Sequence, residues 1–342
     1  MKRVLVVRTD RVGDVVMITP IVREIKKAYP DAFIGTLTQP NTKSIFLNNP
    51  YVDVCIADDL KKESFKTVIS EIKKYKFTDA LLVHPTERAA YQLFLAGIRN
   101  RIGVGRKLYE VITFMKSVSR NNYIPLRHEA DYCMDLARRI GVVTNNIQPE
   151  IFVTEREKLD SKEFLKKFGI KDFHKKILIH TGTRGSAPNW SEQKYSDLIK
   201  TIFDRYELTD YKIILTAYEM TESFKNEVFA IDREKIVDVS HELNGLRELI
   251  VAISLADIFI CSSTGPIHLA DALDKRCIGL HCHRDMNCSK HWGVLNKHSI
   301  NLEVSEEDCQ KYCSSDRNNC GIEKGLPIEN VLKELDKFLK LK

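Results

Sequence analysis

The sequence predicts an α/β protein that contains two successive doubly wound domains, each with a parallel sheet. Apolar strand patterns and amphipathic helix patterns alternate along the chain, which is typical of repeated βαβ units. The alternation pauses in a charged stretch, residues 154–176, and starts again at residue 177. The chain has 342 residues, which is more than one ordinary core needs and enough for two domains.

The first half begins with a short apolar strand at 4–7, a polar loop and an amphipathic helix. We expect this helix to open at Asp14, because apolar residues recur at helical spacing from Ile18 to Ile25. Pro20 lies inside this pattern and should kink the helix or mark where its first turn gives way. Further strands are expected at 33–37, 52–56 and 80–83, and a helix at 128–140.

The second half repeats the alternation. Strands are expected at 177–180, 212–215, 236–239, 258–261 and 277–280. A helix follows Trp190, with Ser191 as its N-cap and with Trp190 and Tyr195 placed to form a hydrophobic staple. An amphipathic helix is expected at 328–341.

These elements predict the domain organisation. The predicted parts are a first domain at 1–155, a connector with some helix of its own at 156–175, a second domain at 176–327 and a C-terminal helix at 328–342. Loops at the carboxyl ends of both sheets would line a crevice between the domains. That crevice is the expected ligand site.

The composition is that of an ordinary soluble globular protein, with 43% hydrophobic residues. No apolar run reaches the ~18 residues of a membrane span, and Arg8 breaks the apolar start too early for a signal peptide. We therefore expect a cytoplasmic protein. The net charge of +6 indicates either a lysine-rich solvated surface or attraction to an anionic substrate or membrane face. Nucleic-acid binding is not expected, because no basic block with interleaved aromatic residues occurs.

Asp14 is the first candidate for chemistry. It follows the polar loop after strand 4–7, where a strand, a loop and a helix N-terminus meet. Ligands of open α/β sheets bind at this edge. A carboxylate there can act as a general base, or it can simply cap the helix and take no part in a reaction.

Residues 259–273 form a second strand–loop–helix junction. The helix begins near Pro266, which suits a first helical turn, and a helix N-terminus favours phosphate. Hydroxyl groups of Ser263 and Thr264 add donors, and His268 lies on the first turn. The alternative is an ordinary turn with a half-buried His268.

Residues 177–199 form a third junction of the same kind, with Thr183 and Arg184 on its glycine-containing loop. A guanidinium there suits a phosphate or a carboxylate. The alternative is a surface arginine in an ordinary loop.

These three segments together resemble a known family. RTDRVGDVVMITPIVREIKKAYPDA, HTGTRGSAPNWSEQKYSDL and SSTGPIHLADALDKRCIGL are similar to motifs of the glycosyltransferase family that holds the bacterial heptosyltransferases of lipopolysaccharide core assembly. Two weaker similarities, RNRIGVG at 99–105 and HEADYCMDLARRIGV at 128–142, fall in the right order. The resemblance spans nearly the whole chain.

The resemblance implies a GT-B fold, in which two Rossmann-like domains face a cleft, and a metal-independent, inverting transfer without a cofactor. The donor would be a nucleotide-diphosphate sugar, ADP-heptose being favoured. The acceptor would be a lipid-linked, anionic oligosaccharide, bound by the first domain, with peripheral contact at the inner face of the inner membrane. Asp14 would be the catalytic base. The implied acceptor-side loop residues are Thr9, Arg11 and Gly13, and the implied donor-binding residues are Thr183, Arg184, Lys194, Ser263, Thr264, Gly265 and His268.

The sequence departs from the family pattern at two donor-side positions. The basic residue that family members commonly carry shortly before the Trp190 position is absent, and Ser263 stands where many members have aspartate. The departures weaken the assignment to ADP-heptose in particular. Two alternatives therefore stay open: a nucleotide-sugar epimerase or hydrolase, and a non-catalytic nucleotide-sugar-binding protein.

Five of the nine cysteines crowd the last quarter of the chain: Cys282, Cys288, Cys309, Cys313 and Cys320. An odd total in a cytoplasmic chain argues against a disulfide framework. The spacing at 309–320 is not that of paired CxxC knuckles. We expect reduced or locally paired structural thiols in preference to a structural metal site formed by Cys309, Cys313 and Cys320.

Overall fold

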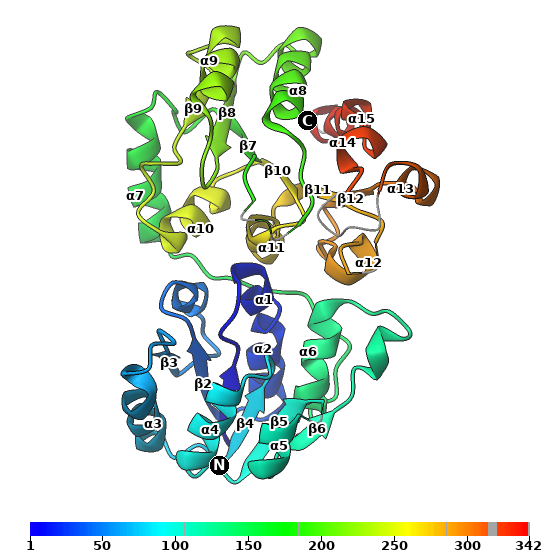
Figure 1. Ribbon diagram of the computed structural model, residues 1–342. Coiled ribbons are helices and arrows are strands. Elements are labelled where there is room, and N and C mark those ends of the chain that lie inside the picture. Colours follow the sequence, from blue (N-terminus) through cyan, green and yellow to red (C-terminus); the bar gives the residue numbers. More distant parts are fainter. Residues whose placement is uncertain (106, 184, 186, 285, 314–319, 341–342) are drawn as a thin grey trace. The chain divides into compact units, whose positions relative to one another are not determined.

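The computed structural model describes residues 1–105, 107–183, 185, 187–284, 286–313 and 320–340 (Figure 1). The chain divides into two compact units, Met1–Phe152 and Val153–Lys342. Most of the expected connector forms helix α7 (Glu155–Lys166), which belongs to the second unit. Thr154 caps this helix through its side chain, which accepts the backbone N–H of Glu157.

The first unit contains a sheet whose described strands are all parallel, in the order β3-β2-β1-β4-β5-β6 (Figure 1). Its strands are β1 (Arg3–Val7), β2 (Phe33–Thr38), β3 (Val54–Ala57), β4 (Asp79–Leu82), β5 (Asn100–Val104) and β6 (Lys116–Val118). Its helices are α1 (Val12–Val16), α2 (Thr19–Ala28), α3 (Ser64–Lys74), α4 (Glu87–Leu95), α5 (Leu108–Ile112) and α6 (Glu129–Arg138), with 3-10 turns η1 (Thr42–Phe46) and η2 (Asn121–Tyr123).

The expected first helix is two helices. Helix α1 begins at Val12, earlier than the predicted start at Asp14, and Arg11 is its N-cap residue. Helix α2 then starts at Thr19, so Pro20 occupies its first turn. A proline is tolerated there because the N–H that it lacks would have no partner within the helix. The apolar pattern is continuous across this break, which is why the pattern alone predicted one helix.

One face of the first sheet packs against α3 and α4. Leu5 and Val7 of β1 belong to a buried cluster with Ile72 of α3 and Leu93 of α4. Alternate side chains of a strand point to opposite faces, and Val4 and Val6 of β1 are also buried. A strand that is apolar on both faces is typical of a parallel sheet between two helix layers.

The second unit contains another sheet of parallel described strands, in the order β12-β11-β10-β7-β8-β9. Its strands are β7 (Lys175–His180), β8 (Tyr211–Thr216), β9 (Ile236–Asp238), β10 (Ile258–Ser262), β11 (Arg276–His281) and β12 (Ile300–Glu303). After α7, its helices are α8 (Glu192–Arg205), α9 (Glu222–Ile231), α10 (Leu246–Ser254), α11 (Gly265–Ala272), α12 (Ser289–Trp292), α13 (Glu306–Tyr312), α14 (Ile322–Gly325) and α15 (Ile328–Lys340).

The predicted start of α8 is confirmed. The Ser191 hydroxyl accepts the backbone N–H of Lys194, as an N-cap does. The Trp190 and Tyr195 rings meet edge to face with their centroids 5.6 Å apart, which is the expected hydrophobic staple.

The strand orders confirm the predicted fold class and locate its ligand-binding edges. Both sheets have the doubly wound order, which reverses between β1 and β4 in the first unit and between β7 and β10 in the second. In open α/β sheets, ligands bind outside the carboxyl ends of the strands at such switch points. Among the described residues, no helix is both long and apolar enough to span a membrane.

Candidate active site

The candidate site of the first unit lies at the switch point between β1 and β4. Arg8 directly follows β1 and Asp14 stands in the first turn of α1. His84 lies just beyond β4, with its Nδ1 3.9 Å from Asp10 Oδ2. The sheet topology therefore brings ionisable residues from three segments to the edge where ligands are expected.

The Arg8 guanidinium is the centre of this site. Its Nη2 lies 2.5 Å from Asp14 Oδ1, its Nη1 lies 2.9 Å from Glu129 Oε1, and its Nε lies 3.1 Å from Asp10 Oδ1. Arg8 is only 4% exposed. A second guanidinium, that of Arg120, binds the other Glu129 oxygen at 2.8 Å. Charge-assisted bonds of this kind fix the positions of the groups they join.

Burial raises the pKa of Asp14, Arg8 lowers it, and the negative charges of Asp10 and Glu129 raise it again. The resulting pKa is about 6, compared with an ordinary value of 3.8. Glu129 differs, because the charges of Arg8 and Arg120 outweigh its burial and hold its pKa below the ordinary value. Carboxyl groups whose pKa values are pushed apart take different chemical roles. Asp14 is suited to exchange a proton near neutral pH, whereas Glu129 stays ionised.

Asp14 is not the cap of helix α1, because Arg11 occupies the N-cap position. Among the described residues, Arg8 is the hydrogen-bond partner of the Asp14 carboxylate and takes Oδ1. The Asp14 side chain keeps 22% of its surface exposed. Oδ2 is therefore left to accept a proton, and capping does not explain this residue.

The other acceptor-side residues hold or flank the loop before α1. Thr9 is buried, and its carbonyl oxygen accepts a hydrogen bond from Gln39 Nε2 at 2.6 Å. Arg11 is exposed and Gly13 is buried within α1. Nothing in this arrangement tests the prediction that these residues bind an acceptor.

The sequence did not single out Arg8, Asp10, Glu129 or Arg120. Glu129 lies more than a hundred positions from Arg8, and only the fold brings the two together. A usable signal was present in the run Arg8-Thr9-Asp10, in which charged residues immediately follow a buried strand.

The candidate site of the second unit lies at the switch point between β7 and β10. Thr183 follows β7, and its Oγ1 accepts the N–H of Gly185 at 3.3 Å. Gly265 is the first residue of α11, with Pro266 behind it. Ser263 is half-buried and donates its backbone N–H to Leu280 at 2.9 Å. These residues leave a loop and a helix N-terminus at the same edge of the sheet, as the sequence predicted.

Three predicted donor residues are engaged inside the unit. Thr264 is buried with its Oγ1 3.2 Å from Cys261 Sγ, and His268 is buried with its ring 5.6 Å from that of Trp292. The half-buried Lys194 donates to the Glu323 carbonyl and lies 4.8 Å above the Trp190 ring. These contacts do not test the prediction that the three residues bind the donor. Arg184 lies outside the described residues.

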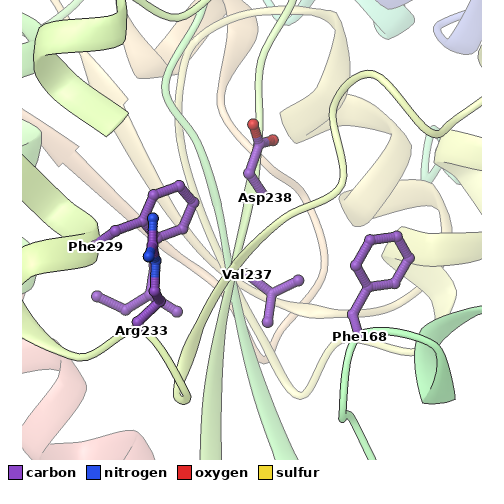
Figure 2. Close-up of a pocket in the computed structure, with 6 residues that line it drawn as sticks. Phe168, Phe229, Arg233, Val237 and Asp238 are labelled. Atoms are coloured by element: carbon purple, nitrogen blue, oxygen red, sulfur yellow. The ribbon is translucent and has the colours of Figure 1, made fainter. Parts of the chain in front are cut away.

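A pocket of about 280 Å³ in the second unit lies along β9 rather than at the switch point (Figure 2). Phe229 and Arg233 line it from the segment before β9, Phe168 from the segment after α7, and Val237 and Asp238 from β9 itself. Since it contains no predicted site residue, we assign it no role in the reaction.

Two doubly wound units in one chain are the architecture of the GT-B fold. The particular family follows from sequence comparison. Residues 66–319 match the model of glycosyltransferase family 9 (heptosyltransferase), and the chain belongs to this family.

Relatives from several bacteria agree with this assignment. A provisionally named glycosyltransferase of Haemophilus influenzae is 25% identical over 99% of this chain and 97% of its own length. Solved structures with the same fold include a glycosyl transferase family 9 protein from Veillonella parvula, with TM-score 0.83, 21% identity and coverage of 99% of this chain and 97% of that one. The E. coli ADP-heptose lipopolysaccharide heptosyltransferase II has TM-score 0.77, 17% identity and coverage of 99% and 98%.

Proposed function

We propose that this protein is a cytoplasmic, inverting glycosyltransferase that moves heptose from ADP-heptose to a lipid-linked, anionic oligosaccharide of the lipopolysaccharide core. The names of its relatives support this donor and this acceptor. One solved relative is named as an ADP-heptose lipopolysaccharide heptosyltransferase. Another is an E. coli heptosyltransferase with ADP, at TM-score 0.71 and 15% identity over 98% of this chain and 99% of that one.

The observation that carries the proposal is the Asp14 carboxylate. Its pKa is about 6, and among the described residues Arg8 bonds to its Oδ1 and leaves Oδ2 able to accept a proton. In an inverting transfer, the acceptor oxygen attacks the anomeric carbon while the bond from that carbon to the diphosphate breaks. The acceptor hydroxyl loses its proton, and Oδ2 of Asp14 receives it. A carboxylate that titrates just below neutral pH is ionised in the cell and still basic enough to take this proton.

The departing diphosphate needs stabilisation of its negative charge. The N-terminus of α11, at Gly265, supplies the positive end of a helix dipole. Thr183 and Ser263 add polar groups at the same edge of the sheet. This set of groups needs no metal ion for the leaving group, and we propose a metal-independent reaction.

The acceptor side is consistent with an anionic substrate. The chain carries a net charge of +6, and Arg11 is exposed beside the Asp14 loop. Cations near the surface attract phosphorylated sugars and the anionic face of a membrane. We therefore propose that Arg11 contacts the acceptor and that the protein works peripherally at the inner face of the inner membrane.

The test is product formation with a panel of donors. Purified protein is incubated with a truncated, lipid-linked core acceptor and with ADP-, UDP- or GDP-linked sugars. We expect transfer from ADP-heptose only, with inversion at the anomeric carbon and no loss of rate when Mg²⁺ and Mn²⁺ are left out of the assay. Transfer from a UDP- or GDP-sugar alone would reject the donor, and release of a free sugar or an epimer without acceptor would reject the transferase.

A further inference from the structure

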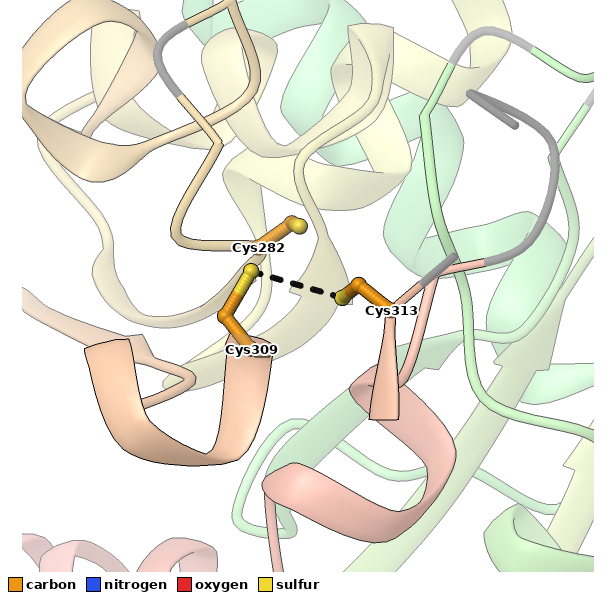
Figure 3. Close-up of side chains that lie close together, drawn as sticks. All are labelled: Cys282, Cys309 and Cys313. Carbon is orange, nitrogen blue, oxygen red and sulfur yellow. Dashed lines mark hydrogen bonds between the residues drawn. The ribbon is translucent and has the colours of Figure 1, made fainter. Parts of the chain in front are cut away.

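Four cysteine side chains of the second unit converge on one point. Cys282 directly follows β11, Cys309 lies on α13, Cys313 ends that helix, and Cys320 precedes α14. Figure 3 shows three of them gathered together. The sulfur atoms of Cys282, Cys309 and Cys313 all lie within 4.8 Å of one another.

The distances between these sulfurs are too long for disulfide bonds and are short enough for sulfurs that bind one metal ion. The Cys309–Cys313, Cys313–Cys320 and Cys320–Cys282 pairs are 3.4, 3.8 and 2.9 Å apart. A disulfide bond is about 2.0 Å long. A tetrahedral zinc ion with Zn–S bonds of about 2.3 Å sets its four sulfurs about 3.8 Å apart. The sulfurs of Cys282, Cys309 and Cys313 are therefore close enough to share one ion, and Cys320 Sγ lies 2.9 Å from that of Cys282 and 3.8 Å from that of Cys313.

The backbone around the sulfurs supports the same interpretation. The N–H of Gly321 donates to Cys313 Sγ at 3.1 Å, and hydrogen bonds of this kind to ligand atoms orient the ligands of metal sites. Residue 321 must be glycine for this approach, because a Cβ there would lie 2.3 Å from Tyr312 Cβ. The segment before α14 is thus held closely against the end of α13.

We propose that Cys282, Cys309, Cys313 and Cys320 bind one structural zinc ion as four thiolates. Each thiol releases its proton as its sulfur coordinates the metal. Four protein ligands close the coordination sphere, so the ion stabilises the fold and does not act on substrate. The proposal goes beyond the transfer reaction and does not depend on it.

The site would fasten the α13–α14 segment to the end of β11. Helix α14 in turn contacts the start of α8, because Trp190 Nε1 donates to the Ile322 carbonyl at 3.2 Å and the Ser191 N–H donates to Glu323 at 2.8 Å. Helix α8 follows the loop after β7. The zinc ion would therefore support two loops at the carboxyl edge of the second sheet.

Metal analysis of the full-length protein, purified under reducing conditions, tests the proposal. We expect about one zinc per chain in the unchanged protein and in the Cys55→Ser control, which alters a free cysteine of the first unit. Cys282→Ser and Cys313→Ser should lose the zinc and melt at a lower temperature. Full zinc content in both of these variants would overturn the proposal.

A second measurement does not need the variants to fold. Exchange of the metal for Co²⁺ in the unchanged protein should produce a sulfur-to-cobalt charge-transfer band and the strong visible absorption of tetrahedral cobalt. A chelator should remove both signals and lower the melting temperature. A protein that binds neither zinc nor cobalt, that holds iron instead, or that forms a Cys282–Cys320 disulfide in its native state would contradict the zinc site.

Discussion

At the scale of single residues, Arg8 determines what Asp14 can do. One guanidinium faces three carboxylates, so it cannot fully neutralise any of them. Glu129 has a second cation in Arg120 and remains ionised. Burial raises the pKa of Asp14, and Arg8, which Asp14 shares with Asp10 and Glu129, does not offset that rise. The pKa of Asp14 is thus higher than that of Glu129 because, among the described residues, Asp14 contacts one cation and Glu129 contacts two.

The first prediction concerns the pH dependence of transfer. Asp14 acts as a base only when ionised, and its pKa is about 6. We therefore expect kcat/KM to rise about tenfold per pH unit below 6 and to level off above it. Initial rates from pH 4.5 to 8.5 would show this. A profile that is flat across pH 6 would mean that another group accepts the proton.

The second prediction concerns Asp10→Asn. Asp10 raises the pKa of Asp14 by its charge and also occupies Arg8. Its neutralisation removes the repulsion and leaves more of Arg8 to Asp14, so the acid limb should move to lower pH. The exposed Asp31→Asn in the same unit is the control and should leave the limb in place. A shift to higher pH in Asp10→Asn would contradict this electrostatic account.

Single residues were predictable from sequence only where the signal was local. Asp14 stood out because it adjoins a strand, a loop and a helix. Arg8 and Glu129 did not, because they lie 121 positions apart in the sequence and only the folded chain brings them together. For Lys194 the structure adds contacts with the Glu323 carbonyl and the Trp190 ring that the sequence did not indicate, and its role as a donor ligand stays a prediction.

At the scale of elements, the candidate donor residues lie at or near the N-termini of helices α8 and α11. Ser191 caps α8 and also donates from its hydroxyl to Glu323 of α14 at 2.7 Å. Cap residues such as this one were readable from sequence. Three strands were not: Arg101 interrupts the apolar run of β5, β6 has only 3 residues, and β12 is half-buried throughout. A strand that lacks an apolar run leaves little pattern to detect.

The third prediction concerns Ser191→Ala. Loss of the cap should lower the free energy of unfolding by about 1 kcal/mol, and loss of the bond to Glu323 should loosen the start of α8 and weaken donor binding. The matched variant Thr154→Ala removes the cap of α7 at a similar cost in stability. Donor affinity, measured by calorimetry, should fall in Ser191→Ala and not in Thr154→Ala. If the two variants bind the donor with equal affinity, the start of α8 does not contribute to donor binding.

At the scale of the whole molecule, two sheets of the same topology carry different chemistry. The switch point of the first unit holds buried charges, and that of the second holds small polar groups and a helix N-terminus. The sequence predicted the two sheets from their repeated alternation. It did not predict the strand order, because order depends on which strands pair across the chain. The switch points therefore became visible only in the structure.

The most direct test of the account is the rate of transfer by Asp14→Asn, which keeps the shape of the side chain and removes its basicity. We predict a fall in kcat of about 10²- to 10⁴-fold, with unchanged circular dichroism and an unchanged affinity for ADP in the second unit. Turnover within a few-fold of the unaltered protein, under saturating donor and acceptor at pH 7.5, would contradict the assignment of Asp14 as the catalytic base.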